Sequence, residues 1–380
     1  MRKIAVITGT RAEYGILEPL IRKISDDKEL ELQLYVTGTH LLNEYGKTID
    51  YIKYPITGIV DMKIKNENSG KDMGLSVAEG VKGFLEAFEK NKPEVIVILG
   101  DRIEPLAASL AALFLKIPIA HLNGGDLTFT LFDEQIRHAI TKMASLHFPA
   151  SELSKKRISG MGEEDWRIHD VGALGLDSVL NEKTLSKDEL FKKYTLDTEK
   201  KTLLIVFHPV TTEWEQAGDQ FSKVLAALNG FDCQKIIIYP NTDAGGYKIV
   251  DEIKKIEGKP DYFIYKSLPH EDYVSFMKAS DVLIGNSSSG IIEAPSVALP
   301  VVNIGTRQDG RERASNIIDI SYNPDEIKKA IEKTLNDSDF LEIVAKKQSP
   351  YGDGRAAEKI ISVLKNVELN DKLIKKRMTY

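Results

Sequence analysis

Hydrophobic positions follow two alternating patterns along most of the chain. Runs that are apolar at nearly every position are typical of strands inside a parallel sheet with both faces covered. They occur at residues 4–8, 32–37, 95–99 and 117–121, and again at 203–207, 235–239, 262–265, 282–284 and 301–304. Segments with helical periodicity separate them, at 16–24, 77–88, 105–115, 214–228, 247–256, 273–279 and 291–298. This alternation predicts βαβ units, and therefore an α/β fold.

A highly charged segment, residues 181–201, separates the two series. Its composition predicts a linker, or a solvated helix plus a linker, and argues against a core strand. After residue 354 we expect a terminal helix followed by a basic tail. The chain therefore reads as two similar α/β halves.

Composition narrows the class of protein. A length of 380 residues suits two domains, and 42% hydrophobic with 28% charged residues is ordinary for a globular protein. The net charge of −6 gives no overall attraction to nucleic acid or to an anionic membrane. The only cysteine, Cys233, excludes an internal disulfide and a cysteine-rich zinc site, and it suits a reducing compartment. We find neither a signal peptide nor an uncharged run of 18 residues, so we expect a cytoplasmic protein without a membrane span.

Polar residues cluster where the predicted strands of the first half end, which is where open α/β sheets bind ligands. The candidates are Arg11 after Gly9, His40, Asp101 beside Arg102, Asn123 and Asp126 around two glycines, and Asp133 at a helix start. Each has a plainer interpretation. The arginine can be a surface residue, the histidine a structural hydrogen-bond partner, the Asp–Arg step a rim ion pair, and Asp133 a helix cap.

The second half carries its own candidates at strand ends. They are His208, Asn241, Asp243, Ser287, Ser288, Glu293 and Arg307. Most informative is the stretch GNSSSGIIE, in which a strand runs into a Gly/Ser turn that opens a helix. Backbone N–H groups at a helix start bind anions, and the helix dipole favours phosphate there. Glu293 is better suited to ribose hydroxyls. The pattern indicates a nucleotide diphosphate compound held mostly by the second half, with its other end facing the carboxylates and histidine of the first.

Nine segments together resemble the UDP-N-acetylglucosamine 2-epimerases, in particular the hydrolysing branch that releases N-acetylmannosamine for sialic-acid-type sugars. They span residues 8–360 and read TGTRAEYG, GTHLLNEYG, LGDRIEPLAAS, HLNGGDLTFTLFDEQIRHAITK, HPVTTE, YPNTDAGG, IGNSSSGIIEAP, NIGTRQDGR and YGDGRAAEKI. The resemblance implies a GT-B fold, with two Rossmann-like domains, a central cleft and a C-terminal helix crossing back to the first domain. We place the first domain at residues 1–180 with 356–380, and the second at 181–355.

The resemblance also implies a reaction and its residues. UDP leaves by anti elimination across carbon-1 and carbon-2, and water adds to the 2-acetamidoglucal, with neither metal nor nicotinamide cofactor. Asp101, Asp133 and His208 match catalytic positions. The positions that bind or shape the UDP site are matched by Arg11, His40, Arg102, Asn241, Asp243, Ser287, Ser288, Glu293 and Arg307. A homodimer is also implied.

One position departs from the family pattern. Many members carry Glu where this chain has Asn123, and Asn cannot act as acid or base. Either Asp126 or Asp133 takes the second carboxylate role, or Asn123 marks a different substrate. The first hypothesis is hydrolysis of UDP-N-acetylglucosamine. The second is the same chemistry on a 2,4-diacetamido-trideoxy sugar nucleotide. A non-hydrolysing epimerase, a GT-B glycosyltransferase and a binding module without catalysis rank below these.

Overall fold

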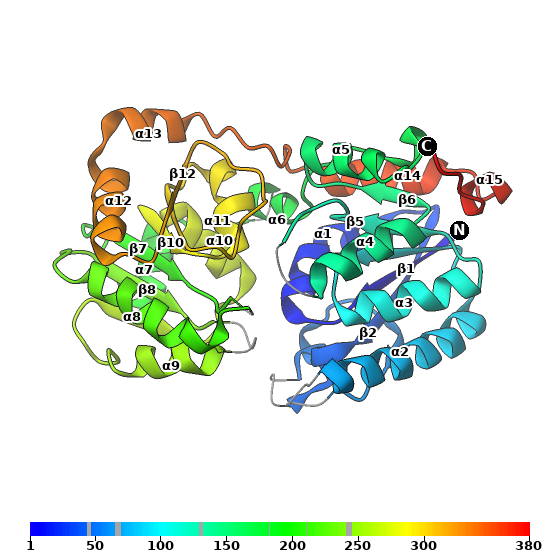
Figure 1. The fold of residues 1–380 in the computed structure, drawn as a ribbon, viewed down its shortest axis with the longest axis horizontal. Coiled ribbons are helices and arrows are strands. Elements are labelled where there is room, and N and C mark those ends of the chain that lie inside the picture. Colours follow the sequence, from blue (N-terminus) through cyan, green and yellow to red (C-terminus); the bar gives the residue numbers. More distant parts are fainter. Residues whose placement is uncertain (44–46, 65–69, 129–131, 182, 211, 241–244) are drawn as a thin grey trace. The chain divides into compact units, whose positions relative to one another are not determined.

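Each series of apolar runs builds a six-stranded parallel sheet of its own (Figure 1). The computed structural model describes residues 1–43, 47–64, 70–128, 132–181, 183–210, 212–240 and 245–380. The first sheet lies in a unit formed by Met1–Leu127, Leu131–Ser178 and Tyr351–Tyr380, and the second in a unit formed chiefly by Val179–Pro350.

The first sheet has the spatial order β3-β2-β1-β4-β5-β6, and every pair of neighbours is parallel. Its strands are β1 (Arg2–Thr8), β2 (Leu30–Thr37), β3 (Ile56–Val60), β4 (Val95–Leu99), β5 (Ile119–Leu122) and β6 (Leu146–Phe148). All five residues of β4 are buried, as its unbroken apolar run predicts for a central strand.

Helices cover both faces of this sheet. They are α1 (Arg11–Asp26), α2 (Gly70–Asn91), α3 (Ile103–Phe114), α4 (Asp133–Met143), α5 (Glu152–Gly160), α6 (Gly175–Asn181), α14 (Ala356–Asn366) and α15 (Asp371–Ile374). One apolar core joins the sheet to α1 and α14, and another joins it to α2, α3 and α4. The C-terminal helix α14 therefore belongs to the first unit, as predicted. Asp177 fixes its start by accepting the backbone N–H groups of Ala356 and Ala357 at 2.8 and 2.7 Å.

The second sheet repeats the same winding, with the order β12-β11-β10-β7-β8-β9 and parallel neighbours throughout. Its strands are β7 (Thr202–Val206), β8 (Gln234–Ile238), β9 (Tyr262–Tyr265), β10 (Val282–Gly285), β11 (Val301–Ile304) and β12 (Ile317–Ile320). Counted in chain order within each unit, both sheets have the 3-2-1-4-5-6 order of a Rossmann fold. The prediction of two Rossmann-like parallel-sheet domains is confirmed.

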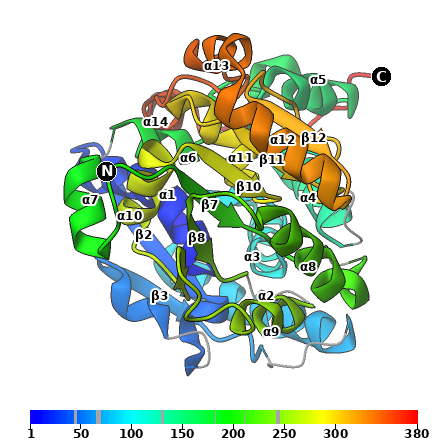
Figure 2. The ribbon, with the colours of Figure 1, turned by 90° about the vertical axis from the view of Figure 1, so that its left-hand side faces the viewer.

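Two helical layers enclose the second sheet (Figure 2). The helices of this unit are α7 (Lys187–Tyr194), α8 (Ala217–Leu228), α9 (Gly246–Lys254), α10 (His270–Ala279), α11 (Ser288–Ile292), α12 (Pro324–Asn336) and α13 (Ser338–Ala345). One core joins the sheet to α8, α9 and α12, and the other joins it to α7 and α10.

Several elements differ from the sequence prediction. The charged segment 181–201 contains α7, whose Leu190 and Phe191 are fully buried, so it contributes to the core and is more than a linker. The edge strands β3, β6 and β12 were not predicted, because they are short and β3 and β12 are mostly exposed or half-buried. Among the described helices, none is both long and apolar enough to cross a bilayer.

Candidate active site

Each sheet reverses its winding at one point, and predicted site residues follow the strands on either side of it. In the first sheet this point lies between β1 and β4, which lead into residues 9–11 and 100–102. In the second it lies between β7 and β10, which lead into His208 and residues 286–288. Doubly wound sheets bind ligands beyond the carboxyl ends of the strands at such a switch point. Each unit therefore presents a candidate ligand-binding surface.

The turn after β1 is fixed by the helix that it opens. Thr10 is the N-cap of α1, and its hydroxyl accepts the backbone N–H of Glu13 at 3.2 Å. The Glu13 carboxyl in turn accepts the N–H of Gly9 at 2.6 Å. Arg11 is the first helical residue and is exposed, with its guanidinium carbon 5.1 Å from the centre of the Tyr51 ring. The turn thus places an arginine at the switch point.

Two carboxyl groups that sequence reasoning missed, those of Glu13 and Glu104, are buried behind this turn. A Cβ added to Gly9 would lie 2.9 Å from the Glu104 side chain, so the glycine makes room for it. Burial raises the pKa of Glu13 to about 8, and the negative charge of Glu104 adds to this while the Gly9 N–H opposes it. Glu13 is therefore protonated at neutral pH. Neither glutamate was singled out, because Glu13 and Glu104 lie just before the predicted helical segments 16–24 and 105–115.

Asp101 follows β4 and pairs with the guanidinium of Arg137, which is buried on α4. The same guanidinium donates to the backbone carbonyl of Asp126 at 2.9 Å and to the Glu134 carboxylate at 3.0 Å. Asp101 therefore pairs with Arg137, whereas the plainer interpretation of the sequence was a rim ion pair with Arg102. Arg102 has extended backbone angles before α3, and its Nε lies 3.3 Å from a Glu104 carboxylate oxygen.

His40 is buried behind β2, with both ring nitrogens engaged. Its Nε2 lies 3.0 Å from the Thr8 hydroxyl and its Nδ1 lies 2.8 Å from the Thr48 hydroxyl. Burial lowers the pKa of His40 to about 4, so the ring is neutral near pH 7. These contacts favour a role in holding the turn over direct contact with a ligand.

The structure of the loop after β5 accounts for Asn123 and Asp126, whose roles the sequence left open. Asn123 has a φ of 59°, in the left-handed region that Asn adopts more readily than most residues. Its identity therefore has a backbone reason independent of any substrate. The carboxylate of Asp126 is buried and accepts the Ser154 hydroxyl at 2.7 Å. This contact favours Asp133 over Asp126 as the second carboxylate of the site.

Asp133 is the first residue of α4, in the same helical turn as Glu134 and one turn before Arg137. The N-cap position belongs to Phe132, so the plain interpretation of Asp133 as the helix cap is not supported. A carboxylate in the first turn is still favoured by the helix dipole. One helix thus supplies both Asp133 and the cation that pairs with Asp101.

In the second unit Asn286 joins the ends of β7 and β10. Its Oδ1 accepts the backbone N–H of His208 at 2.7 Å, and its Nδ2 donates to the carbonyl of the same residue at 2.8 Å. Gly285 has a φ of 139°, and a Cβ there would lie 2.1 Å from the carbonyl oxygen of Val206, so only glycine fits. Burial, assisted by the positive charge of Arg307, lowers the pKa of His208 to about 3. The imidazole is therefore neutral near pH 7. Sequence reasoning did not single out Asn286.

Arg307 lies against the turn that carries the predicted serines. Its Nη1 donates to the carbonyl of Asn286 at 3.1 Å. Ser287 is the N-cap of α11, with its hydroxyl accepting from the N–H of Ser289, and Ser288 is the first helical residue. The structure therefore brings Arg307, the two serines and the His208 backbone around Asn286.

The helix α11 is shorter than the sequence predicted. It has five residues, so Glu293 stands at its C-terminal cap and not one turn inside it. A helix this short contributes little dipole, so any preference for anions here depends on Arg307, the hydroxyls and the free N–H groups. Burial raises the pKa of Glu293 to about 7, and the charge of Arg311 opposes this. The predicted residues Asn241 and Asp243 lie outside the described residues.

The family is decided by a match over most of the chain. Residues 22–365 match the model of the UDP-N-acetylglucosamine 2-epimerases. The chain belongs to this family. It is therefore an epimerase of the UDP-N-acetylglucosamine 2-epimerase family, and the resemblance noted in the sequence is confirmed.

Two relatives of this epimerase are similar over nearly the whole length. It is 38% identical to the UDP-N,N'-diacetylbacillosamine 2-epimerase (hydrolyzing) of Legionella pneumophila, over 100% of both chains. It is 36% identical to the GDP/UDP-N,N'-diacetylbacillosamine 2-epimerase (hydrolyzing) of Campylobacter jejuni, over 97% of both chains.

A solved structure shares the fold. The UDP-GlcNAc 2-epimerase from Neisseria meningitidis bound to UDP-GlcNAc superposes with a TM-score of 0.82 over 96% of this chain and 99% of that one, at 20% identity. This likeness shows the GT-B fold of the family.

The two candidate ligand-binding surfaces of the epimerase differ in what they can do chemically. The first offers a carboxylate, Asp101, which the buried Arg137 guanidinium holds in place. The second offers hydroxyls, a neutral imidazole and one arginine, which are suited to hold phosphate.

Proposed function

We propose that this epimerase is a hydrolysing 2-epimerase, which converts a UDP-2-acetamido sugar and water into UDP and the free 2-epimeric sugar. The observation that carries the proposal is the Asp101–Arg137 pair at the switch point of the first sheet. The names of the two relatives at 38% and 36% identity support the hydrolysing reaction. Anti elimination of UDP gives the glycal, and water adds at carbon-1 while a proton returns to carbon-2.

Removal of the carbon-2 proton needs a positioned base, because that proton is only weakly acidic. A general base or acid typically contributes about 10²- to 10⁴-fold. We assign proton handling to Asp101, with Asp133 as its partner at the sugar. His208 is neutral in the folded protein, so it would act at the leaving group or at hydroxyls as a hydrogen-bond donor or acceptor and not as a cation.

UDP is proposed to bind chiefly at the second surface. Arg307 and the hydroxyls of Ser287 and Ser288 would contact the diphosphate, and charge that develops on the departing UDP would be stabilised there. From the family resemblance, Asn241 and Asp243 would help to shape this site and Glu293 would accept ribose hydroxyls. The same resemblance makes Arg11 and Arg102 of the first unit candidate UDP-binding residues.

For the sugar, we rank a 2,4-diacetamido-2,4,6-trideoxy hexose ahead of N-acetylglucosamine, reversing the order suggested by sequence alone. Both relatives above are named for diacetylbacillosamine nucleotides, and this supports the change. Asn123 contributes little to the choice of sugar, because its left-handed backbone conformation already favours Asn at this position. UDP-N-acetylglucosamine, the substrate suggested by the family description, remains the second candidate.

The test is product analysis with three separate substrates in deuterium oxide. UDP-N,N'-diacetylbacillosamine, GDP-N,N'-diacetylbacillosamine and UDP-N-acetylglucosamine are each incubated with pure protein and no acceptor. We expect fastest turnover of the first, with free sugar that carries deuterium at carbon-2. Product that keeps its carbon-2 proton would exclude elimination, and an epimerised nucleotide sugar would exclude hydrolysis.

A variant at Asp133 tests whether this residue takes part in the proton transfer. Asp133→Asn should slow both sugar release and deuterium incorporation, since an amide cannot carry a proton. The matched control is Asp188→Asn, at an exposed helix-start carboxylate on α7, which should behave as wild type. Equal rates in wild type and Asp133→Asn would remove Asp133 from the mechanism.

A further inference from the structure

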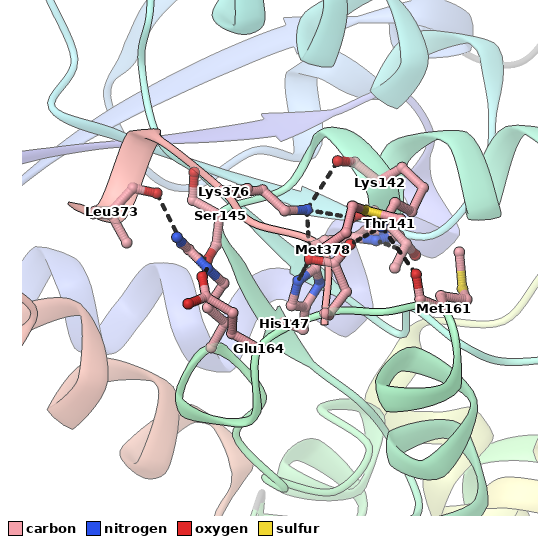
Figure 3. A network of polar contacts seen from close by, with 12 residues as sticks. Thr141, Lys142, Ser145, His147, Met161, Glu164, Leu373, Lys376 and Met378 are labelled. Carbon is pink, nitrogen blue, oxygen red and sulfur yellow. Dashed lines mark hydrogen bonds and ion pairs between the residues drawn. The ribbon is translucent and has the colours of Figure 1, made fainter. Parts of the chain in front are cut away.

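The last residues of the chain are bound to the first unit by buried polar contacts (Figure 3). Arg167, which is fully buried, donates through Nη1 to the carbonyl of Leu373 at 2.8 Å and through Nη2 to that of Lys372 at 2.7 Å. Farther along, the N–H of Thr379 donates to the carbonyl of Gly162 at 3.3 Å. The basic tail expected from the sequence is therefore an ordered segment, defined here as residues 371–380.

Lys376 of this segment contacts the end of the helix that supports the active site. Its Nζ donates to the carbonyl of Lys142 at 2.8 Å, and the carbonyl of Thr141 lies 3.4 Å away (Figure 3). Both carbonyls belong to the last turn of α4, where helix carbonyls lack partners within the helix and where the dipole favours a cation. Lys376 therefore caps α4 from a position more than 230 residues later in the chain.

The ammonium group is held in place by a buried carboxylate. Glu163 has no exposed side-chain surface, and its Oε2 lies 2.5 Å from Lys376 Nζ and 3.0 Å from His147 Nε2. Its Oε1 lies 2.5 Å from Lys142 Nζ. Although burial opposes ionisation, the hydrogen bonds from His147, Lys142 and Lys376 lower the pKa of Glu163 to about 2. Buried charges of this kind are retained only where partners compensate them, and they fix one geometry.

A short chain of contacts leads from this cap to Asp101. The Thr141 hydroxyl oxygen lies 3.0 Å from the carbonyl of Arg137, one helical turn earlier. Arg137 then pairs with Asp101. In parallel, Nδ1 of His121 lies 3.1 Å from the Thr141 hydroxyl, and its Nε2 lies 2.8 Å from the carbonyl oxygen of Gly100. Gly100 directly precedes Asp101. Both contacts of Thr141 therefore lead to the Asp101 turn.

We infer that Lys376 is a positioning residue for Asp101, acting through the C-terminal turn of α4 and the Arg137 guanidinium. The inference rests on the proposed function, in which Asp101 handles the proton. The segment 371–380 thereby becomes part of the catalytic apparatus without touching substrate. Small displacements of a proton-transferring group cost rate steeply while leaving binding of the nucleotide nearly unchanged.

The experiment compares three full-length variants with wild type. Lys376→Met removes the cap and the charge, Lys376→Arg restores both, and Lys375→Met removes a neighbouring exposed lysine that pairs only locally with Asp371. We expect Lys376→Met to lower kcat by about 10-fold or more with KM changed by less than about 2-fold. Lys376→Arg should recover most of the loss, and Lys375→Met should match wild type.

A second measurement does not depend on turnover. Amide hydrogen exchange in the last turns of α4, residues 137–143, should accelerate in Lys376→Met and not in Lys375→Met, because the cap holds that end of the helix. If Lys376→Met does not fold, Lys376→Gln keeps a donor for the α4 carbonyls, and Thr379→Pro removes the N–H that anchors the end of the tail and also restricts the backbone there. Both should give smaller changes in the same direction.

Three results would overturn the inference: a wild-type kcat in Lys376→Met, an equal loss in Lys375→Met, or a raised KM with unchanged kcat. Failure of the proposed function is distinguished by the wild-type protein, which would then release no sugar from any of the three nucleotides. In that case exchange at α4 alone decides whether Lys376 orders the helix that carries Arg137.

Discussion

The two candidate ligand-binding surfaces of this molecule stand on sheets of identical strand order, yet their side chains differ in chemistry. In the first unit the strand ends carry ion pairs, Asp101 with Arg137 and Glu104 with Arg102. In the second unit a neutral side chain, Asn286, joins the two central strands through paired hydrogen bonds to the backbone of His208.

This difference separates two tasks that the fold alone does not distinguish. The buried Arg137 guanidinium holds the Asp101 carboxylate in one orientation, which suits a group that is proposed to handle a proton. A preformed neutral turn with one arginine beside it can hold an anion at little cost in reorganisation. Variants of Asp101 and Asp133 should therefore change the rate of chemistry, and variants of Arg307 and Ser288 should change the affinity for UDP.

The largest effect is expected from Asp101→Asn. Turnover should fall by about 10²-fold or more, because the amide cannot accept a proton. The UDP dissociation constant from calorimetry should stay close to that of wild type. A near wild-type kcat would show that Asp101 does not transfer the proton. A weakened affinity for UDP would contradict the assignment of proton handling to Asp101 and of UDP binding to the second surface.

Its control is Glu134→Gln, which removes the other carboxylate that contacts Arg137, at 3.0 Å. If Asp101 matters only for holding Arg137, the two variants should lose similar activity. We expect the Glu134→Gln loss to be at least about 10-fold smaller, since general acid–base catalysis belongs to one carboxylate.

Next in size is Arg307→Ala. Losing a charge-assisted contact to phosphate typically costs about 1.5–3 kcal/mol, or about 10- to 100-fold in the UDP dissociation constant. Lys329→Ala, at an exposed position on α12 of the same unit, is the control for loss of positive charge alone. Equal weakening in both would mean that the effect is long-range attraction and not a contact.

The sequence predicted most of the scaffold from its apolar runs. The central strands β1, β4, β7 and β10 are buried over most of their length, and each contains an unbroken apolar run, such as IAVI in β1 and LLIV in β7. Three edge strands were not predicted: β3 and β12 are mostly exposed or half-buried, and β6 has only three residues, whereas the edge strand β9 was predicted from its run YFIY. For the charged segment a linker, or a solvated helix plus a linker, was predicted, and the burial of Leu190 and Phe191 in α7 was missed because they stand in the mostly charged sequence KDELFKKY.

The site was predictable only in part, for a related reason. Residues such as Asp101 and His208 directly follow predicted strands in the sequence, so their place at the end of the sheet could be predicted. Their partners come from elsewhere in the chain. Arg137 lies 36 residues from Asp101, and Asn286 lies 78 residues from His208. No local pattern marks such a pair, because it is created by the order of strands in the sheet.

A smaller effect, on stability, tests whether Glu13 is protonated in the first unit. Its folded pKa of about 8 lies above the ordinary 4.5, so the unfolded chain loses the proton first and stability falls as pH rises from about 4.5 to 8. Glu13→Gln should remove this contribution. Relative to wild type, the variant should gain at least about 1.4 kcal/mol between pH 5 and pH 8, the free energy of one pKa unit.

Thermal unfolding across this pH range measures the effect, with Glu86→Gln, at an exposed position on α2, as the control. Glu293, with its pKa also raised, adds a similar slope that both variants retain, so it cancels in the comparison. A parallel pH dependence in wild type and Glu13→Gln would mean that Glu13 is ionised, and the first unit would then hold an uncompensated buried charge.

The smallest effect is expected from Ser288→Ala, and it sharpens the account of the second surface. Because α11 has only five residues, its dipole contributes little, and the contribution of each donor should be visible separately. A neutral hydroxyl contact is typically worth about 0.5–1.5 kcal/mol, so UDP should bind about 2- to 10-fold more weakly.

In the double variant with Arg307→Ala the loss of binding free energy should be less than the sum of the two single losses if both groups hold the same phosphate, since contacting residues couple. Calorimetry with UDP on the four proteins gives this coupling directly. Strict additivity would place Ser288 and Arg307 on different parts of the nucleotide, and the turn at Asn286 would then not be a single phosphate site.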